Sequence, residues 1–172
     1  PFAGSFDGMG HTIRGLYLDV EDTYVGLFGK VTGGSGQKIQ NLTVSGNIPV
    51  GGRVSYVAGI AARIVGNDSN DRVEITNCHS NVRICVTGIR TLDAGVGGIA
   101  GKVNGGSLKG CLTRNVQIVA GNYQYTNQSG FVGGIAGCVD NSGSIEYCGR
   151  EEGSLTSWYQ GTESSGSYLG GI

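Results

Sequence analysis

The sequence predicts an all-β protein, a right-handed parallel β-helix (a solenoid) of about five coils with essentially no helix. The first observation is a glycine-rich segment that returns every 33 to 39 residues along the 172-residue chain. The second is that apolar residues alternate with polar ones and do not follow helical spacing. The third is that a unit of this size cannot bury an apolar face by itself, so successive copies must stack.

The recurring segment is clearest at residues 95–103, which read Gly-Val-Gly-Gly-Ile-Ala-Gly-Lys-Val. Related copies begin at Tyr24, Tyr56 and Phe131, and residues 168–172 start a fifth copy. Its aligned central positions lie 33, 39, 36 and 37 residues apart and are Leu27, Ile60, Ile99, Ile135 and Ile172. We expect strands here, with valine and isoleucine as core rungs and glycine letting neighbouring coils lie close together.

A second set of apolar positions follows each copy of the segment. Its members are Ile39, Ile75, Leu108 and Ile145, and Ile13 fits the same pattern near the start of the chain. Three residues further on stand Leu42, Cys78, Cys111 and Cys148, with Leu16 in that place after Ile13. Alternating strands follow, such as residues 82–86, so one face of each is expected to be buried. Coils about 4.8 Å apart would give five of them a height of roughly 25 Å.

We expect residues 1–172 to form one β-helical segment, which the repeats subdivide. A leader covers residues 1–23, repeats cover about 24–55, 56–94, 95–130 and 131–167, and residues 168–172 begin a further repeat. Each repeat is longer than a minimal coil because it carries a loop, at residues 48–55, 88–94, 121–130 and 151–167. The chain starts at Pro1 and stops inside a repeat. We therefore expect it to be an excerpt from a longer protein.

Composition narrows the classes of function. Glycine supplies 34 residues and proline only 2, and the glycine is periodic, which indicates ordered repeats. The formal net charge is −1, so no basic surface for nucleic acid or anionic membranes is expected. No apolar run approaches the length of a membrane span, since Arg63 interrupts the best candidate. The first residues also lack the basic start and the apolar block of a secretory signal.

The segment Gly26-Leu27-Phe28-Gly29 resembles the core of the GLUG family of repeats. The opening Phe6-Asp7-Gly8-Met9-Gly10-His11-Thr12-Ile13 is similar to the segment that precedes the first such repeat. Later copies depart from it, reading Gly-Ile-Ala-Gly at 98–101 and 134–137 and Gly-Ile-Ala-Ala at 59–62. The resemblance implies a β-helical segment of a bacterial surface or secreted protein, of the adhesin type or from a non-catalytic region of an IgA-cleaving extracellular peptidase. It implies no catalytic residues.

The five cysteines are expected to be structural thiols. Cys78, Cys111 and Cys148 share a position that also takes leucine, which is typical of a core site where cysteine acts as a small hydrophobe. A disulfide between adjacent coils is the alternative. Spacings of 33 and 37 residues do not resemble a zinc site, which needs close pairs. Cys85 and Cys138 fall on positions expected to face outward.

Lys30, Arg63 and Lys102 share one strand position with Cys138 and are expected to face outward on adjacent coils. Such a row either keeps the sheet face soluble or meets an acidic polymer. Neither His11 nor His79 has an acid or cysteine at ligand spacing, so both are expected to be surface residues.

Paired acids are relevant because parallel β-helices host polysaccharide-cleaving enzymes. Asp68 and Asp140 both follow a glycine-rich strand, and two coils would separate them by roughly 10 Å, near the outer limit for an inverting glycosidase. Residues 66–71 nevertheless have the composition of an ordinary turn, with a calcium site at Asp68, Asn70 and Asp71 as the alternative. No lysine or arginine is expected to converge there. The sequence therefore predicts no enzyme, no catalytic residue, no metal and no cofactor.

The loops carry the best binding signal. Tyr123 and Tyr125 lie in one loop, Trp158 and Tyr159 in the next, and consecutive repeats should place both loops at the same corner. Aromatic rings beside amides and hydroxyls suit a sugar or a protein surface, with packing against the stack as the alternative. We expect a non-catalytic stalk or adhesion module at a bacterial surface or outside the cell, whose partners are glycans, surface proteins and other domains of its own chain.

Overall fold

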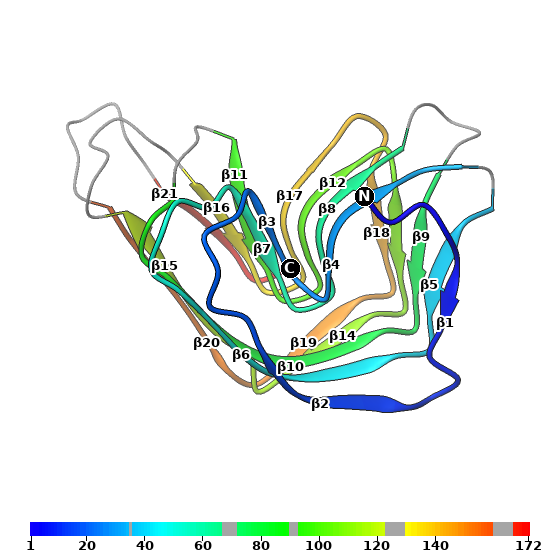
Figure 1. Ribbon diagram of the computed structural model, residues 1–172, viewed down its shortest axis with the longest axis horizontal. Coiled ribbons are helices and arrows are strands. Elements are labelled where there is room, and N and C mark those ends of the chain that lie inside the picture. The colour runs from blue at the N-terminus through cyan, green and yellow to red at the C-terminus, as the bar shows by residue number, and fades with distance from the viewer. Residues whose placement is uncertain (35, 67–71, 90–92, 123–129, 160–166) are drawn as a thin grey trace.

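The computed structural model describes residues 1–34, 36–66, 72–89, 93–122, 130–159 and 167–172. Over these ranges the chain is all β, and parallel strands stack as a solenoid of about four turns (Figure 1). The predicted fold class is therefore confirmed. No helix long and apolar enough to cross a membrane occurs in the described ranges.

Each coil passes through four sheets, which we number I to IV in chain order. Sheet I contains, in spatial order, β1 (Phe6–Asp7), β5 (Lys38–Gln40), β9 (Glu74–Thr76), β13 (Ser107–Lys109) and β18 (Ser144–Glu146). Sheet II contains β2 (Thr12–Tyr17), β6 (Thr43–Val50) and β10 (His79–Val86), followed by β14 (Leu112–Arg114) with β15 (Gln117–Asn122) and by β19 (Gly149–Glu151) with β20 (Ser154–Tyr159).

The glycine-rich segment forms the other two sheets. Sheet III contains β3 (Tyr24–Val25), β7 (Tyr56–Ala58), β11 (Ala94–Gly97), β16 (Gly130–Gly133) and β21 (Ser167–Gly170). Sheet IV contains β4 (Phe28–Thr32), β8 (Ala61–Val65), β12 (Ala100–Asn104) and β17 (Ala136–Asp140).

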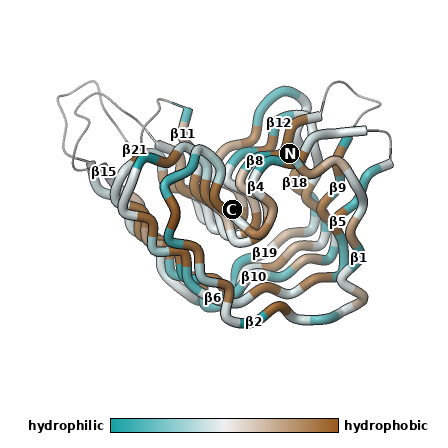
Figure 2. Tube along the Cα trace, in the orientation of Figure 1, coloured by the Kyte–Doolittle hydropathy of each residue, from teal (hydrophilic) through white to brown (hydrophobic). Residues whose placement is uncertain are grey.

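The core consists of rungs that repeat from coil to coil. In sheet III, Val96 pairs with Val57 on one side and Val132 on the other, and all three are buried. Ile60, Ile99 and Ile135 lie between the two strands of their segment and are fully buried. Apolar residues recur at the same place in successive coils, as the tube coloured by hydropathy shows (Figure 2). Stacking buries a face that one repeat could not bury alone.

Each glycine-rich segment turns back on itself, so sheets III and IV run side by side within the outline of the coil (Figure 1). A Cβ atom on Gly101 would lie 2.5 Å from the carbonyl oxygen of Ala62, 2.7 Å from that of Gly95 and 3.0 Å from the nitrogen of Val57. These atoms belong to the backbone, which cannot move aside as a side chain could. Glycine therefore lets sheets III and IV close on each other. Because Ala62 and Val57 belong to the preceding coil, glycine also lets neighbouring coils lie close together, as the sequence predicted.

The first coil differs from the alignment expected from the sequence. The partner of Ile39 in sheet I is Phe6, and Ile13 pairs instead with Val44 in sheet II. The placement of Ile13 and Leu16 in the second set of apolar positions is therefore wrong. The reason is that Phe6 lies 33 residues before Ile39, close to the normal repeat length, whereas Ile13 lies only 26 before it. The later members pair as expected, Ile75 with Ile39 and Leu108 with Ile75.

A left-handed residue makes the corner between sheets I and II. Asn41, Asn77, Gly110 and Tyr147 occupy equivalent places, with φ angles of 54°, 51°, 61° and 54°. Asparagine and glycine are the residues that most readily adopt this conformation. The corner sets the direction in which the strands of sheet II begin.

Candidate functional site: a buried lysine between two aspartates

The four aromatic residues predicted to bind are only partly within the described structure. Tyr123 and Tyr125 lie outside the described residues, and Tyr159 belongs to β20 with its side chain undescribed. Trp158 is half-buried, and a Cβ on Gly121 of the preceding coil would lie 2.3 Å from its Cδ2 atom. The indole of Trp158 therefore packs over Gly121, on the side of sheet II that faces away from the core.

The strands that flank the two loops do come together. Gly121 pairs with Trp158 and Asn122 with Tyr159 where β15 and β20 end. Gly130 pairs with Ser167 where β16 and β21 begin. The strand ends that flank residues 123–129 and 160–166 therefore lie at matching places on adjacent coils.

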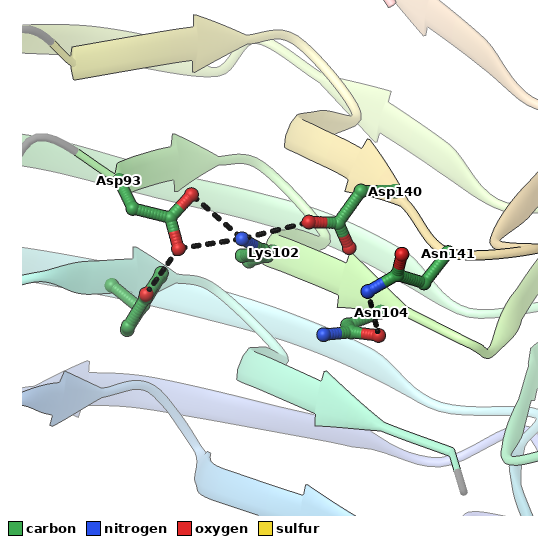
Figure 3. Close-up of polar contacts among 6 residues, drawn as sticks. Asp93, Lys102, Asn104, Asp140 and Asn141 are labelled. Carbon is green, nitrogen blue, oxygen red and sulfur yellow. Dashed lines mark hydrogen bonds and ion pairs between the residues drawn. The ribbon is translucent and has the colours of Figure 1, made fainter.

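A cluster of charged residues lies where sheets III and IV meet, around Lys102 (Figure 3). Its ammonium nitrogen Nζ lies 2.6 Å from both carboxylate oxygens of Asp93 and 2.8 Å from Oδ2 of Asp140. Asp93 immediately precedes β11, Lys102 is in β12 and Asp140 ends β17, so three segments contribute. Lys102 is only 4% exposed, whereas the side chains of Asp93 and Asp140 are 52% and 36% exposed. One buried cation thus ties two partly solvated anions across adjacent strands.

Tyr56 and Arg63 extend this cluster toward the preceding coil. The hydroxyl of Tyr56 donates a hydrogen bond of 3.0 Å to Oδ2 of Asp93. The guanidinium of Arg63 lies over the ring of Tyr56, 5.0 Å from its centroid, a typical cation–π geometry. On the other side, Nδ2 of Asn141 donates to Oδ1 of Asn104 at 3.2 Å (Figure 3). The cluster thus spans three coils.

The surroundings of the cluster favour the ionised forms of Lys102 and Asp93. Burial raises the pKa of Asp93, but hydrogen bonds from Lys102 and Tyr56 outweigh it and leave that pKa below its ordinary value. Burial lowers the pKa of Lys102, but its bonds to Asp140 and Asp93 outweigh burial and leave that pKa raised. Burial, with the bond to Asp93, raises the pKa of Tyr56. All three shifts favour an ionised Lys102–Asp93 pair beside a neutral tyrosine at neutral pH.

These directions decide what the cluster can do chemically. A lysine that acts as a general base needs a lowered pKa, and a carboxyl that acts as a general acid needs a raised one. In the cluster the pKa of Lys102 is raised and that of Asp93 is lowered, which is the opposite of both requirements. Asp93, Cys138 and Asp140 present ligand atoms within 4.8 Å of one another, as a metal site would require. The ammonium of Lys102, however, occupies the place that a cation would take between the carboxylates, so the arrangement fits an ionic clamp.

The cluster corrects two expectations from the sequence. Lys102 was expected to face outward, and no lysine was expected to converge on Asp140, but Lys102 is buried against it. The shared position itself is confirmed, because Lys102 pairs with Arg63 and with Cys138 in sheet IV, and Lys30 pairs with Arg63. Asp68, the other acid of the pair with Asp140, and the calcium alternative at residues 68–71 lie outside the described residues.

Asp93 had no role in the sequence interpretation. It stands directly before a glycine-rich strand, while Asp140 stands directly after the next one. Because each segment turns back on itself, these two places meet at the same edge. A prediction of that turn from the sequence would have placed Asp93 beside Lys102.

The five cysteines are free thiols, as the structural interpretation expected. Cys78 and Cys111 are buried, and each Sγ atom lies 3.4 Å from a backbone carbonyl oxygen, that of Thr76 and Ile75 respectively. Burial raises the pKa of Cys78 to about 11. Cys148 is half-buried in the last coil, where a hydrogen bond with the Cys111 thiol, together with the Cys111 backbone N–H at 3.3 Å, lowers its pKa to about 7.

We expect Cys148 to react with iodoacetamide at pH 7 at least about tenfold faster than Cys138, because the thiolate is the nucleophile. Both are half-buried, but burial raises the pKa of Cys138 whereas that of Cys148 is lowered. Peptide mapping after timed alkylation measures both rates in one sample. Equal rates at the two positions, or first modification at Cys78, would contradict this assignment.

No protein-family model matches the chain, and no curated protein matches it. Among solved structures, the chain resembles the crystal structure of a putative immunoglobulin A1 protease from Bacteroides ovatus, at 18% sequence identity and a TM-score of 0.47. The match covers 99% of this chain and 69% of that one. A likeness at this level carries no argument about function, and the resemblance to GLUG repeats stays a prediction from the sequence.

Proposed function

We propose that this chain is a non-catalytic β-solenoid stalk or adhesion module of a bacterial cell-surface or secreted protein, presenting loops for binding glycans or proteins. The observation that carries the proposal is the matched position of two loop-bearing corners on adjacent coils, where Trp158 lies outside the core over Gly121. A stack of coils holds such loops at fixed spacing, which suits recognition of an extended ligand.

Two alternative functions each have an observation in their favour. An accessory segment of a large extracellular peptidase is favoured by the resemblance to GLUG repeats. A polysaccharide lyase or hydrolase is favoured by the convergence of Tyr56, Asp93, Lys102 and Asp140. The pKa directions weigh against the enzyme, because Lys102 stays protonated and Asp93 stays ionised.

A glycan and host-matrix binding array tests the proposal, with intact protein beside Trp158→Ala and Tyr125→Ala. We expect intact protein to bind a defined subset of the array and both variants to lose at least about tenfold in affinity, since stacked aromatic anchors dominate such contacts. Tyr147→Ala is the matched control, because Tyr147 is 86% exposed at another corner of the coil. Binding that survives both loop substitutions would move the site away from these loops, and no binding by intact protein would leave only a spacer.

A further inference from the structure

The outer face of sheet II is hollowed along β6 and β10. The largest hollow on this face has a volume of about 360 Å³ and is lined by Tyr17, Asn47, Ile48, Pro49, Arg83 and Cys85. A second hollow of about 200 Å³ lies at the start of the two strands, at Thr43 and His79. A third of about 190 Å³ lies beyond their end, at Gly51 and Thr87. The three hollows therefore follow the strands along one face, and the largest is of the size that holds a small ligand.

A β-bulge in the first coil builds one wall of the largest hollow. Ile13 pairs with Val44, but the register then shifts so that Leu16 pairs with Gly46 and Tyr17 with Asn47. Without the extra residue, Leu16 would stand opposite Asn47 and Tyr17 would turn toward the core. The bulge instead places Tyr17, 65% exposed, in one outward row with Asn47 and Arg83 on the next two coils. Bulges are over-represented at sheet edges and next to active sites, where they re-aim a side chain.

The charge of this face differs from that of the whole chain. The outward positions of the sheet II strands carry three arginines, Arg14, Arg83 and Arg114, and one acid, Glu151, whereas the chain as a whole has net charge −1. Glu151 forms its ion pair with Arg114, at 2.8 Å. The nearby acids of residues 19–22 come after β2 has ended. Among the described residues, no carboxylate is within ion-pair distance of the exposed Arg83.

We infer that this hollow is a binding site for an acidic glycan, with the carboxylate of a uronic-acid unit paired to Arg83 and the sugar ring against Tyr17. A guanidinium binds a carboxylate through two parallel hydrogen bonds, and the amide of Asn47 can bond hydroxyl groups beside it. Pro49 and Cys85 provide an apolar floor for the ring. The residues belong to the first three coils, so this site is separate from the loops of Tyr125 and Trp158, which belong to the last two.

A glycan fits this face better than a peptide or a nucleic acid. A peptide that binds a β-sheet through its backbone needs a free edge, and β6 and β10 are each flanked by strands on both sides. A nucleic acid needs a field of many cations to replace its counterions, and the chain has net charge −1. A single unpaired guanidinium beside an exposed ring matches one carboxylated sugar unit.

Titration of the intact chain with tetragalacturonate, followed by two-dimensional amide NMR, tests the inference. The matched ligand is the methyl ester of the same oligosaccharide, which keeps the rings and removes the charges. We expect shifts confined to β2, β6 and β10, and loss of binding with the ester. Arg83→Gln and Tyr17→Ala should each weaken binding by at least about tenfold. Arg72→Gln, which removes the same charge near sheet I, should leave binding within about twofold.

Four results would overturn the inference. They are equal binding of the ester, equal binding of a glutamate oligopeptide of the same charge, shifts that fall on β20 and β21, and no shifts at millimolar ligand. Arg83 and Tyr17 are exposed, so the amide spectrum of each variant will show whether the fold is intact before affinity is compared. Because Trp158→Ala leaves these residues untouched, failure of the loop proposal and failure of this one are distinguishable.

Discussion

Gly101→Val is expected to lower the free energy of unfolding by about 3 kcal/mol, the upper end of the cost of forcing a side chain into a filled interior. The Cβ alone would lie 3.0 Å or less from three backbone atoms of β7, β8 and β11. Sheets III and IV would have to separate to admit it, and their rungs on both sides would lose contact. Chemical denaturation of the intact chain, followed by circular dichroism, measures the change.

Gly149→Val is the matched control for this substitution. Gly149 also lies in a strand, β19, but the nearest atom to its added Cβ is Cδ1 of Leu112 at 3.7 Å, an ordinary contact. We expect a change within about 0.5 kcal/mol there. Gly101→Ala should fall between the two, because Ala62 occupies the equivalent position of the second coil and is fully buried. An equal loss at Gly101 and Gly149 would mean that glycine is not required by the contact of sheets III and IV.

Lys102→Met is expected to lower the free energy of unfolding by about 2 kcal/mol at pH 7. Removing one partner of a buried ion pair leaves the other charges uncompensated, and the partial exposure of Asp93 and Asp140 reduces that cost. The methionine keeps most of the length and packing of the lysine side chain. Lys38→Met is the matched control, because Lys38 and Glu74 form an exposed ion pair, and its cost should stay below about 0.5 kcal/mol.

The free energy of unfolding should change with pH in opposite directions in the unchanged protein and in Lys102→Met. The pKa of Asp93 is lowered by folding, so its stabilising contribution is present above its ordinary value near 3.8 and is lost as pH falls through the depressed folded value. The pKa of Lys102 is raised, so its contribution is present below 10.5 and is lost as pH rises through the folded value. Without Lys102, protonation of Asp93 relieves its repulsion with Asp140, so mild acid should stabilise the variant relative to pH 7. A parallel acid loss in both proteins would contradict the ionic clamp.

The sequence was a good guide wherever one coil predicts the next. The spacing of Ile60, Ile99 and Ile135 placed them in a continuous core, and the shared position of Lys30, Arg63, Lys102 and Cys138 is the register of sheet IV. Repetition makes these predictions reliable, because each copy meets the same surroundings. The first coil was misaligned because Ile13 and Leu16 match the residue pattern of the second set, although Phe6 is the residue that lies one repeat length before Ile39.

The candidate site was harder to predict for a physical reason. Alternation along a strand tells which residues face the core, and it assumes that the other face meets water. In sheet IV the other face meets sheet III, so Lys102 is buried without being part of the apolar core. Asp93 and Lys102 are 9 residues apart, yet their contact depends on the turn between β11 and β12. The bulge that exposes Tyr17 is likewise visible only in the pairing of β2 with β6.

Hydrogen exchange of the intact chain, with and without tetragalacturonate, tests the central claim that the glycine-rich segment is scaffold. Amides of β11 and β12 bond to both neighbouring coils, so we expect them to exchange only through global unfolding, among the slowest in the protein. Their rates should not respond to ligand beyond the change in global stability. Fast exchange in β11 and β12 that slows selectively when a ligand is added would mean that the segment is a ligand cradle, and the account of it as scaffold would be wrong.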